Sequence, residues 1–147
     1  NSKFEAVKRV EKIITQPYPG FPTDSQALFT TLAAVADGTS VIVENIFESR
    51  FKHVPELLRM GAKICTEGRV AVVEGVERLY GADVQSQDLR GGAALVLAGL
   101  CAEGTTSISN IGYIDRGYEN FEDCLCSLNA DIYRKEKKDG ATTKKNI

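Results

Sequence analysis

The sequence predicts an α/β protein made of two similar units that follow one another along the chain. Helix-like and strand-like stretches alternate from about residue 10 to residue 136. The pairs Gly38-Thr39 and Gly104-Thr105 each end a predicted helix and begin a predicted strand, 66 residues apart. Charged residues repeat at the same offset, and units that repeat at a long period bury their apolar faces against each other. We therefore expect units at about residues 10–75 and 76–136.

The elements of the first unit follow from apolar patterns and from turn residues. A strand is expected at 10–15, and three prolines between residues 16 and 22 exclude a helix there. Thr23 or Asp24 is expected to cap a helix at 25–36, which ends at Gly38. β-Branched residues predict a strand at 39–47. A helix at 54–60, with Pro55 in its first turn, and strands at 63–66 and 69–73 complete the unit.

The second unit repeats this order with a longer helix. A strand is expected at about 76–84, and an apolar run predicts a helix at 89–102 that ends before Gly104. Further predictions are a strand at 105–111, a helix at 121–128 and a last strand at 131–135. Residues 137–147 contain too few apolar side chains to pack, and we expect them to be disordered.

Charge and hydropathy exclude two classes of partner. The chain has 147 residues, 18 of them basic and 20 acidic, and its net charge of -2 argues against a nucleic-acid surface. No apolar stretch reaches the length of about 20 residues that crosses a bilayer, so no membrane partner is expected. The four cysteines, spaced unlike a zinc site, are expected to be reduced and mostly buried in a cytoplasmic protein. With His53 as the single histidine, no metal site is expected.

Charged residues at helix starts and strand ends are the candidate ligand groups, because α/β proteins gather their sites there. They are Asp24, Arg50, Asp88, Arg90, Asp115 and Arg116. Three arginines at equivalent repeat positions could converge on a phosphate or carboxylate, which a guanidinium binds bidentately. The simpler alternative is structural, with Asp24 as a helix cap and Arg116 as a surface ion-pair partner.

Four strings in order carry a resemblance to a known family. They are PYPGFPTD at 17–24, ESRFKHVPEL at 48–57, DLR at 88–90 and IDRGYE at 114–119. Together they closely resemble the C-terminal part of the UDP-N-acetylglucosamine 1-carboxyvinyltransferases, over about residues 10–136. The resemblance implies an inverted α/β barrel of repeated βαβαββ units, with two units present and residues 1–136 forming a partial domain of this enolpyruvyl transferase fold.

The activity implied by the resemblance is the first committed step of peptidoglycan synthesis. This family transfers enolpyruvate from phosphoenolpyruvate to the 3'-hydroxyl of UDP-N-acetylglucosamine through a tetrahedral intermediate, releases phosphate, and needs no cofactor. By motif position, Asp24 would be the base at the sugar hydroxyl. Arg50 and Arg90 would hold the carboxylate of phosphoenolpyruvate, and Arg116 its phosphate.

Other positions receive binding or structural roles. The resemblance implies that Ile46 contacts the amino sugar through its backbone and that Asp88 and Leu89 belong to the substrate-binding set. Since His53 follows the Arg50 motif, we expect it to pack or bond locally. The small residues after Arg90 are expected to let the helix at 89–102 pack closely, and Cys101 in that helix is expected in the core.

The same resemblance implies that part of the active site lies in sequence absent here. A lysine, a reactive-loop cysteine or aspartate, and another arginine belong to the N-terminal part of these enzymes. We therefore expect this chain alone to be inactive, and to associate with the rest of the enzyme or with itself. Two alternatives are a 3-phosphoshikimate 1-carboxyvinyltransferase and a non-catalytic binding or structural fragment of the same fold.

Overall fold

The computed structural model describes residues 7–135 and 144–146. The first unit contains β1 (Lys12–Ile14), the short 3-10 helix η1 (Thr23–Ser25), α1 (Gln26–Ala34), β2 (Thr39–Val43), α2 (Val54–Arg59), β3 (Lys63–Glu67) and β4 (Val70–Glu74). The second unit contains β5 (Asp83–Gln85), α3 (Leu89–Cys101), β6 (Ser107–Ser109), α4 (Gly112–Asp115), α5 (Phe121–Ser127) and β7 (Lys144–Asn146).

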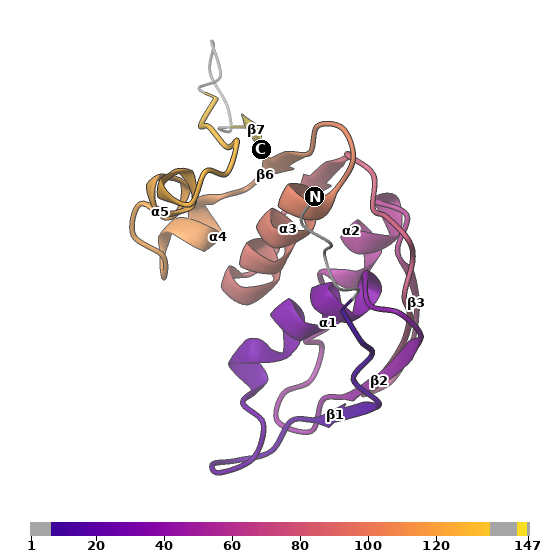
Figure 1. The fold of residues 1–147 in the computed structure, drawn as a ribbon. Coiled ribbons are helices and arrows are strands. Elements are labelled where there is room, and N and C mark those ends of the chain that lie inside the picture. Colours follow the sequence, from indigo (N-terminus) through magenta and orange to yellow (C-terminus); the bar gives the residue numbers. More distant parts are fainter. Residues whose placement is uncertain (1–6, 136–143, 147) are drawn as a thin grey trace.

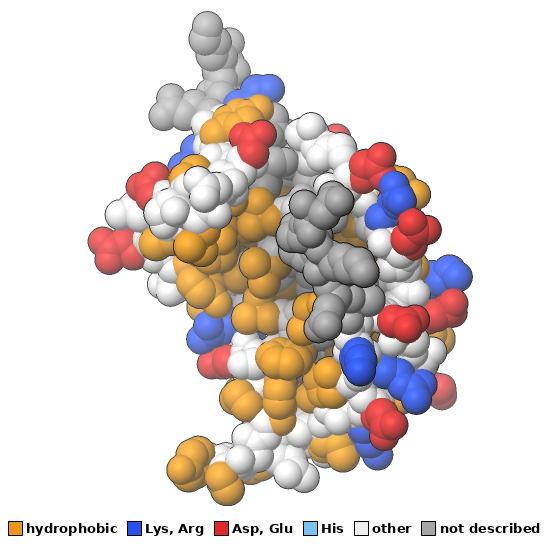
Figure 2. All heavy atoms as spheres, viewed as in Figure 1, with side chains coloured by type: hydrophobic (Ala, Val, Ile, Leu, Met, Phe, Trp, Pro, Cys, Tyr) orange, Lys and Arg blue, Asp and Glu red, His pale blue; other side chains and the backbone are white. Residues whose placement is uncertain are grey.

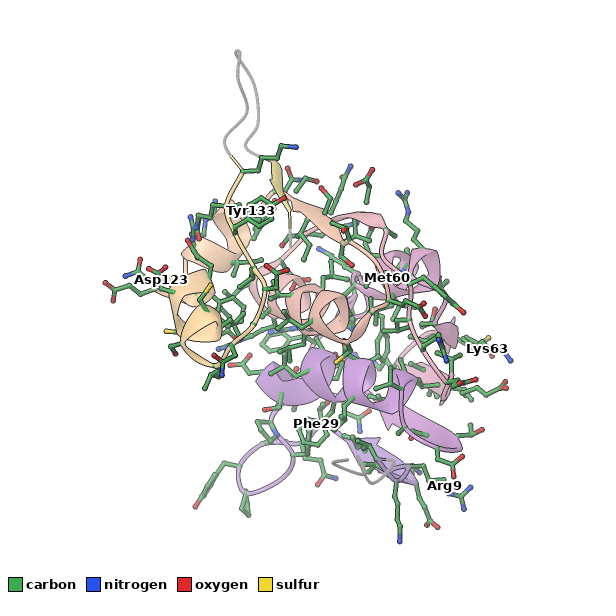
Figure 3. The ribbon with its side chains drawn as sticks, turned by 45° about the horizontal axis from the view of Figure 1, so that its top comes forward. Arg9, Phe29, Met60, Lys63, Asp123 and Tyr133 are labelled. Atoms are coloured by element: carbon green, nitrogen blue, oxygen red, sulfur yellow. The ribbon has the colours of Figure 1, made fainter. Side chains whose placement is uncertain are left out.

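The first unit has the βαβαββ order that the resemblance implied. Its four strands form one sheet in the order β1-β2-β4-β3. β1 and β2 are parallel and are joined by α1, while β4 pairs antiparallel with both β2 and β3. The sheet curves around α1 and α2 (Figure 1). Met60, at the end of α2, is fully buried. Lys63, at the start of β3, points away from the rest of the protein (Figure 3).

The second unit repeats the same arrangement. β5 and β6 are parallel and joined by α3, and β7 pairs antiparallel with β6, as β4 does with β2. Both Gly38 and Gly104 adopt positive φ angles, of 100° and 91°, where the chain leaves a helix for a strand. The α/β fold class is thus confirmed, and the shared connection of two parallel strands through a helix agrees with the predicted repeat.

The two units meet where α1 lies against α3 (Figure 1). The hydroxyl of Thr31 donates a hydrogen bond to the carbonyl of Ala94 across this contact, at 3.4 Å. Gly92 permits the close packing of α3, because a Cβ there would lie 2.3 Å from Ser86 Oγ and 2.7 Å from Ile114 Cγ1. The interpretation of these small residues as packing residues is confirmed.

Several expected boundaries differ from the structure. The strand expected at 76–84 is reduced to β5, because the Val76 and Tyr80 amides donate to the carbonyls of Ala34 and Met60 instead of to a strand. The strand expected at 39–47 ends at Val43. Neither η1 nor α1 has a side-chain cap, so the expected capping by Thr23 or Asp24 is wrong.

The C-terminal part also departs from expectation. Residues 131–135 form no strand; instead Ile132 is buried and Arg134 pairs with Asp115 and Glu122, which fixes the segment by its side chains. The short helix α4 was not foreseen. Within the tail expected to be disordered, residues 144–146 form β7, and residues 137–143 and 147 lie outside the described residues.

The expectation of buried cysteines is wrong. Cys65, Cys101, Cys124 and Cys126 are all free and exposed, and Cys101 lies at the solvent-facing end of α3 and not in the core. In the described ranges, no group of three or more acidic, histidine or cysteine side chains could hold a metal ion. None of the helices described is long and apolar enough to span a membrane.

Candidate active site

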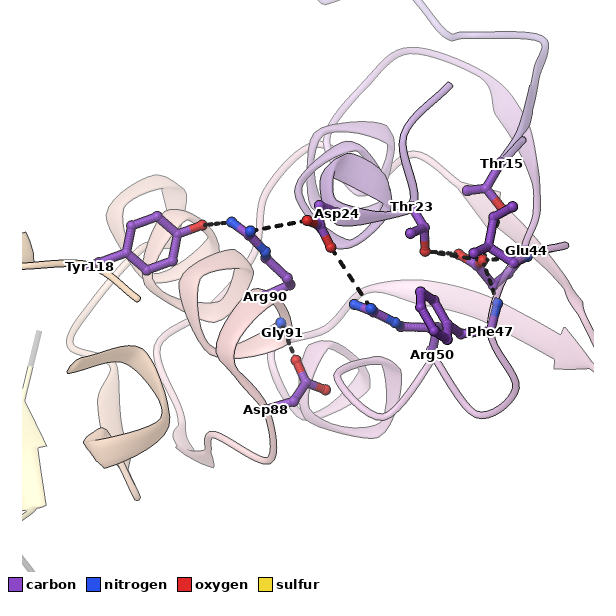
Figure 4. A network of polar contacts seen from close by, with 11 residues as sticks. Thr15, Thr23, Asp24, Glu44, Phe47, Arg50, Asp88, Arg90, Gly91 and Tyr118 are labelled. Carbon is purple, nitrogen blue, oxygen red and sulfur yellow. Dashed lines mark hydrogen bonds and ion pairs between the residues drawn. The ribbon is translucent and has the colours of Figure 1, made fainter. Parts of the chain in front are cut away.

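Asp24 is the centre of a charged cluster formed by both units. Its carboxylate lies on η1, just before α1, and 55% of the side chain is exposed. Oδ2 accepts a hydrogen bond from Arg90 Nη2 at 3.1 Å, and Oδ1 lies 3.8 Å from Arg50 Nη2 (Figure 4). The fold therefore brings together three of the predicted site residues.

Arg90 is positioned by the start of α3. The carboxylate of Asp88 caps this helix by accepting a hydrogen bond from the Gly91 amide at 2.5 Å, so its first role here is structural. The guanidinium of Arg90 donates to the Tyr118 hydroxyl at 3.0 Å on one side and to Asp24 on the other. The hydrogen bond to Tyr118 raises the pKa of Arg90 against the opposing effect of desolvation, and the nearby Asp24 adds to the rise, so Arg90 keeps its charge.

Arg50 is positioned by the loop after β2. Its guanidinium lies over the ring of Phe47, 4.5 Å from the centroid, a cation–π contact that directs it toward Asp24. Ser49 between them has a positive φ of 56°, and this turn folds Arg50 back over the ring.

An open pocket with about 780 Å³ of empty space lies beside the cluster. It is lined by Asp24, Phe47, Glu48, Ser49, Arg50, Lys52, Asp88, Leu89 and Arg90. Two guanidiniums and an ammonium thus face the same space, together with the predicted Asp88 and Leu89. Ile46 is adjacent in the chain, and its amide donates to Glu44 at 3.0 Å. This arrangement can bind an anion and hold a carboxylate within reach of it.

Arg116 does not join this cluster. It is exposed, and its guanidinium lies 5.3 Å from the centroid of the Tyr113 ring. This contact repeats that of Phe47 with Arg50 at the 66-residue offset, so each unit carries the same local arrangement of an aromatic ring and an arginine. Arg50 and Arg90, and not Arg116, therefore line the pocket.

His53 lies behind the pocket and faces no solvent. Its side chain is 2% exposed, and its Cβ lies 3.1 Å from where a Cβ on Gly91 would be. Desolvation by burial lowers the pKa of His53 to about 4, against the smaller opposing effect of Asp88. The imidazole is therefore neutral at neutral pH, in agreement with the expected packing role.

Two residues that matter to the site were missed by sequence reasoning. Tyr118 holds Arg90, and its ring stacks on Phe121 with centroids 4.8 Å apart. Glu44 is 1% exposed and accepts hydrogen bonds from Thr15, Thr23 and two backbone amides. Tyr118 belongs to the quoted IDRGYE string, which was a usable signal, whereas Glu44 directly follows β2, an ordinary β-branched strand.

Comparison with known proteins identifies the family. The family model described as EPSP synthase (3-phosphoshikimate 1-carboxyvinyltransferase) matches residues 3–125. The chain belongs to this family of enolpyruvyl transferases. An enolpyruvyl transferase of known structure, NikO from Streptomyces tendae, superimposes with a TM-score of 0.79 and 32% identity, over 86% of this chain and 29% of that one. EPSP synthase from Acinetobacter baumannii shares the fold, with a TM-score of 0.62 and 20% identity.

Curated relatives carry the more specific name that the motifs suggested. The chain is 64% identical over 122 residues to the UDP-N-acetylglucosamine 1-carboxyvinyltransferase of Desulfofundulus thermocisternus, covering 83% of this chain and 50% of the relative. It is 59% identical over 124 residues to that of Sulfurovum sp. (strain NBC37-1), covering 84% and 29% respectively. The chain thus spans half or less of the length of these relatives.

Proposed function

We propose that this chain is the part of a UDP-N-acetylglucosamine 1-carboxyvinyltransferase that supplies the base and three anion-binding arginines. The observation that carries the proposal is the carboxylate of Asp24 between Arg50 and Arg90, at the edge of an open pocket. The names of the curated relatives support this substrate class over other members of the family.

The two arginines of the pocket are proposed to bind the carboxylate of phosphoenolpyruvate. The guanidiniums of Arg50 and Arg90 converge on one position, which the carboxylate of Asp24 occupies in this structure. The planar donor pair of a guanidinium matches the two oxygens of a carboxylate. Arg116, which lies outside the pocket in this structure, is proposed to bind the phosphate group after closure of the complete enzyme. Fixed cations at the places where negative charge gathers stabilise the transition state, because they need no reorganisation during the reaction.

Asp24 is proposed as the general base at the 3'-hydroxyl. When the carboxylate of phosphoenolpyruvate binds to Arg50 and Arg90, it replaces Asp24 as their partner and leaves the side chain able to accept a proton. The 3'-oxygen then forms a bond to C2 of phosphoenolpyruvate while C3 gains a proton, which gives the tetrahedral intermediate. Loss of a proton from C3 and departure of phosphate restore the double bond in the enolpyruvyl product.

The sugar nucleotide is proposed to bind along the rest of the pocket. Ile46 would contact the amino sugar through its backbone, and Asp88 and Leu89 lie at the start of α3 on the pocket wall. Closure against the N-terminal part of the enzyme would complete the site and exclude water. We place the reaction in the cytoplasm, as a step of peptidoglycan synthesis, with no metal or cofactor.

The second candidate activity is that of a 3-phosphoshikimate 1-carboxyvinyltransferase, because the matching family model carries that description. The acceptor substrate distinguishes the two activities. The full-length enzyme is assayed for phosphate release from phosphoenolpyruvate, with UDP-N-acetylglucosamine or with shikimate 3-phosphate as the acceptor. We expect release only with the sugar nucleotide, and release only with shikimate 3-phosphate would contradict the proposal. No release with either acceptor would favour a non-catalytic binding or structural role for this fold, against which the Asp24, Arg50 and Arg90 cluster argues.

A further inference from the structure

Glu44 is a buried carboxylate without a cationic partner. It follows β2 directly, its side chain is 1% exposed, and among the described residues no ion pair joins it to a basic side chain. A buried charge of this kind persists only where hydrogen-bond donors surround it. The donors around Glu44 therefore show what the carboxylate holds in place.

The donors come from three separate segments of the first unit. The Thr15 hydroxyl, after β1, donates to Oε1 at 2.8 Å, and the Thr23 hydroxyl, in η1, lies 3.1 and 3.0 Å from the two carboxylate oxygens. The amides of Ile46 and Phe47, in the loop after β2, donate to Oε1 at 3.0 and 3.2 Å. One carboxylate thus ties together three segments that are far apart in the sequence (Figure 4).

Two of these segments carry the residues of the pocket. Thr23 is the direct neighbour of Asp24, and its hydroxyl is used for Glu44 instead of capping a helix. Phe47 supports the guanidinium of Arg50 at 4.5 Å. Glu44 therefore fixes both sides of the contact between Asp24 and Arg50, although it touches neither side chain in this pocket.

We propose that Glu44 is a positioning residue that sets the geometry of Asp24 relative to Arg50, and so prepares the base and the anion site for the reaction. The inference rests on the proposed function for its kinetic test. A base or an anchoring group displaced by about 1 Å loses on the order of 100-fold in rate. The substrate does not contact Glu44 in this account, so its substitution acts only through the two loops.

The test uses the full-length enzyme with Glu44→Met and Glu44→Gln. Methionine has a similar length but accepts no strong hydrogen bond, whereas glutamine keeps one oxygen for the same donors. We expect kcat per folded molecule to fall about 100-fold in Glu44→Met and to return to within about tenfold of the unsubstituted enzyme in Glu44→Gln. Equal losses in both variants, or a folded Glu44→Met within threefold of the original kcat, would overturn the proposal.

A second buried glutamate provides the matched control. Glu56 is 5% exposed, accepts a hydrogen bond from the Gln85 amide at 3.0 Å and, unlike Glu44, lies 3.9 Å from a cation, Arg59 Nε; neither Asp24 nor Arg50 is among these partners. Glu56→Met should lower the melting temperature and leave kcat per folded molecule unchanged. A loss equal to that of Glu44→Met would show that any buried carboxylate has this effect, and would overturn the proposal.

Two further measurements keep the result decisive. If Glu44→Met does not fold, Thr23→Val is used instead, because it removes one donor to Glu44 with little change in shape. We expect kcat to be about tenfold lower in Thr23→Val. An unchanged kcat would overturn the proposal. If the full-length enzyme itself transfers no enolpyruvate, the proposed function fails separately. Binding of pyruvate, a carboxylate without a phosphate group and therefore a probe of Arg50 and Arg90, then decides the role of Glu44, with about tenfold weaker binding expected in Glu44→Met than in Glu44→Gln, and equal binding overturning it.

Discussion

The carboxylate of Asp24 lies 3.1 Å from the guanidinium of Arg90, and the two residues hold equivalent positions, 66 residues apart, in the two repeated units. Arg50 approaches the same carboxylate to 3.8 Å. Repetition of one unit has thus placed a negatively charged residue just before α1 and a positively charged one in the first turn of α3, and the two helices pack together. An anionic ligand of these arginines must compete with Asp24.

Asp24→Asn tests this competition. Because the amide no longer attracts both guanidiniums, we expect phosphoenolpyruvate, whose carboxylate is assigned to Arg50 and Arg90, to bind about two- to fivefold more tightly, the range expected for a half-exposed ion pair. The turnover of the full-length enzyme should fall by about 100-fold or more, since a general base is lost. Calorimetric titration with phosphoenolpyruvate and a kinetic assay measure the two effects, with Asp83→Asn on β5 as the control. Weaker binding of phosphoenolpyruvate in Asp24→Asn would contradict the account.

Tyr118→Phe tests how Arg90 is held. The change removes the hydroxyl that accepts from Arg90 at 3.0 Å and keeps the ring that stacks on Phe121. We expect the KM for phosphoenolpyruvate to rise about fivefold, from the loss of one hydrogen bond to a charged group, with little change in melting temperature. Tyr80→Phe, at an exposed tyrosine outside the pocket, should change neither value. An unchanged KM in Tyr118→Phe would show that Asp24 alone positions Arg90.

Gly92→Ala tests the close packing of α3. The added methyl group would lie 2.3 Å from Ser86 Oγ and 2.7 Å from Ile114 Cγ1. We expect the free energy of unfolding to fall by about 1–3 kcal/mol, as in other overpacked cores. At Gly112, in α4, an added Cβ meets nothing within 4 Å, so Gly112→Ala should be neutral or slightly stabilising. Urea denaturation of both variants measures the difference, and equal stabilities would be incompatible with this packing.

His53 predicts a pH dependence of stability. Its pKa is lowered to about 4 in the folded chain, so between pH 6.5 and 4 the unfolded chain takes up a proton that the folded chain does not. The contribution of neutral His53 to the free energy of unfolding is therefore fully present above pH 6.5. It falls by up to about 3 kcal/mol as the pH approaches 4. In His53→Leu, the free energy of unfolding should not show this decrease between pH 6.5 and 4, as measured by urea denaturation at several pH values. If the free energy of unfolding of both proteins depended on pH in the same way, His53 would be protonated in the folded chain over this range.

The sequence predicted those parts of the fold that depend on local signals. Gly38 and Gly104 mark the helix ends correctly because their positive φ angles suit glycine. The start of α3 follows from its apolar run, and its observed N-cap is Asp88. The sequence failed where tertiary contacts decide: residues 76–82 look like a strand, but their amides bond to helix ends and loops.

The site shows the same division. The four motif strings were sufficient to select Asp24, Arg50 and Arg90, which the fold brings together. Glu44 could not be selected, because its donors Thr15 and Thr23 lie 29 and 21 residues away and come near it only when β1, η1 and β2 assemble. The place of Arg116 outside the pocket also depends on assembly, since its spacing alone makes it equivalent to Arg50.

The most direct test of the proposed function is phosphate release by this chain mixed with the N-terminal remainder of a close family member, in the presence of phosphoenolpyruvate and UDP-N-acetylglucosamine. We expect release that requires both protein parts and both substrates, that is absent with this chain alone, and that is lost when the chain carries Asp24→Ala. Release that persists with Asp24→Ala would contradict the role of Asp24 as the base.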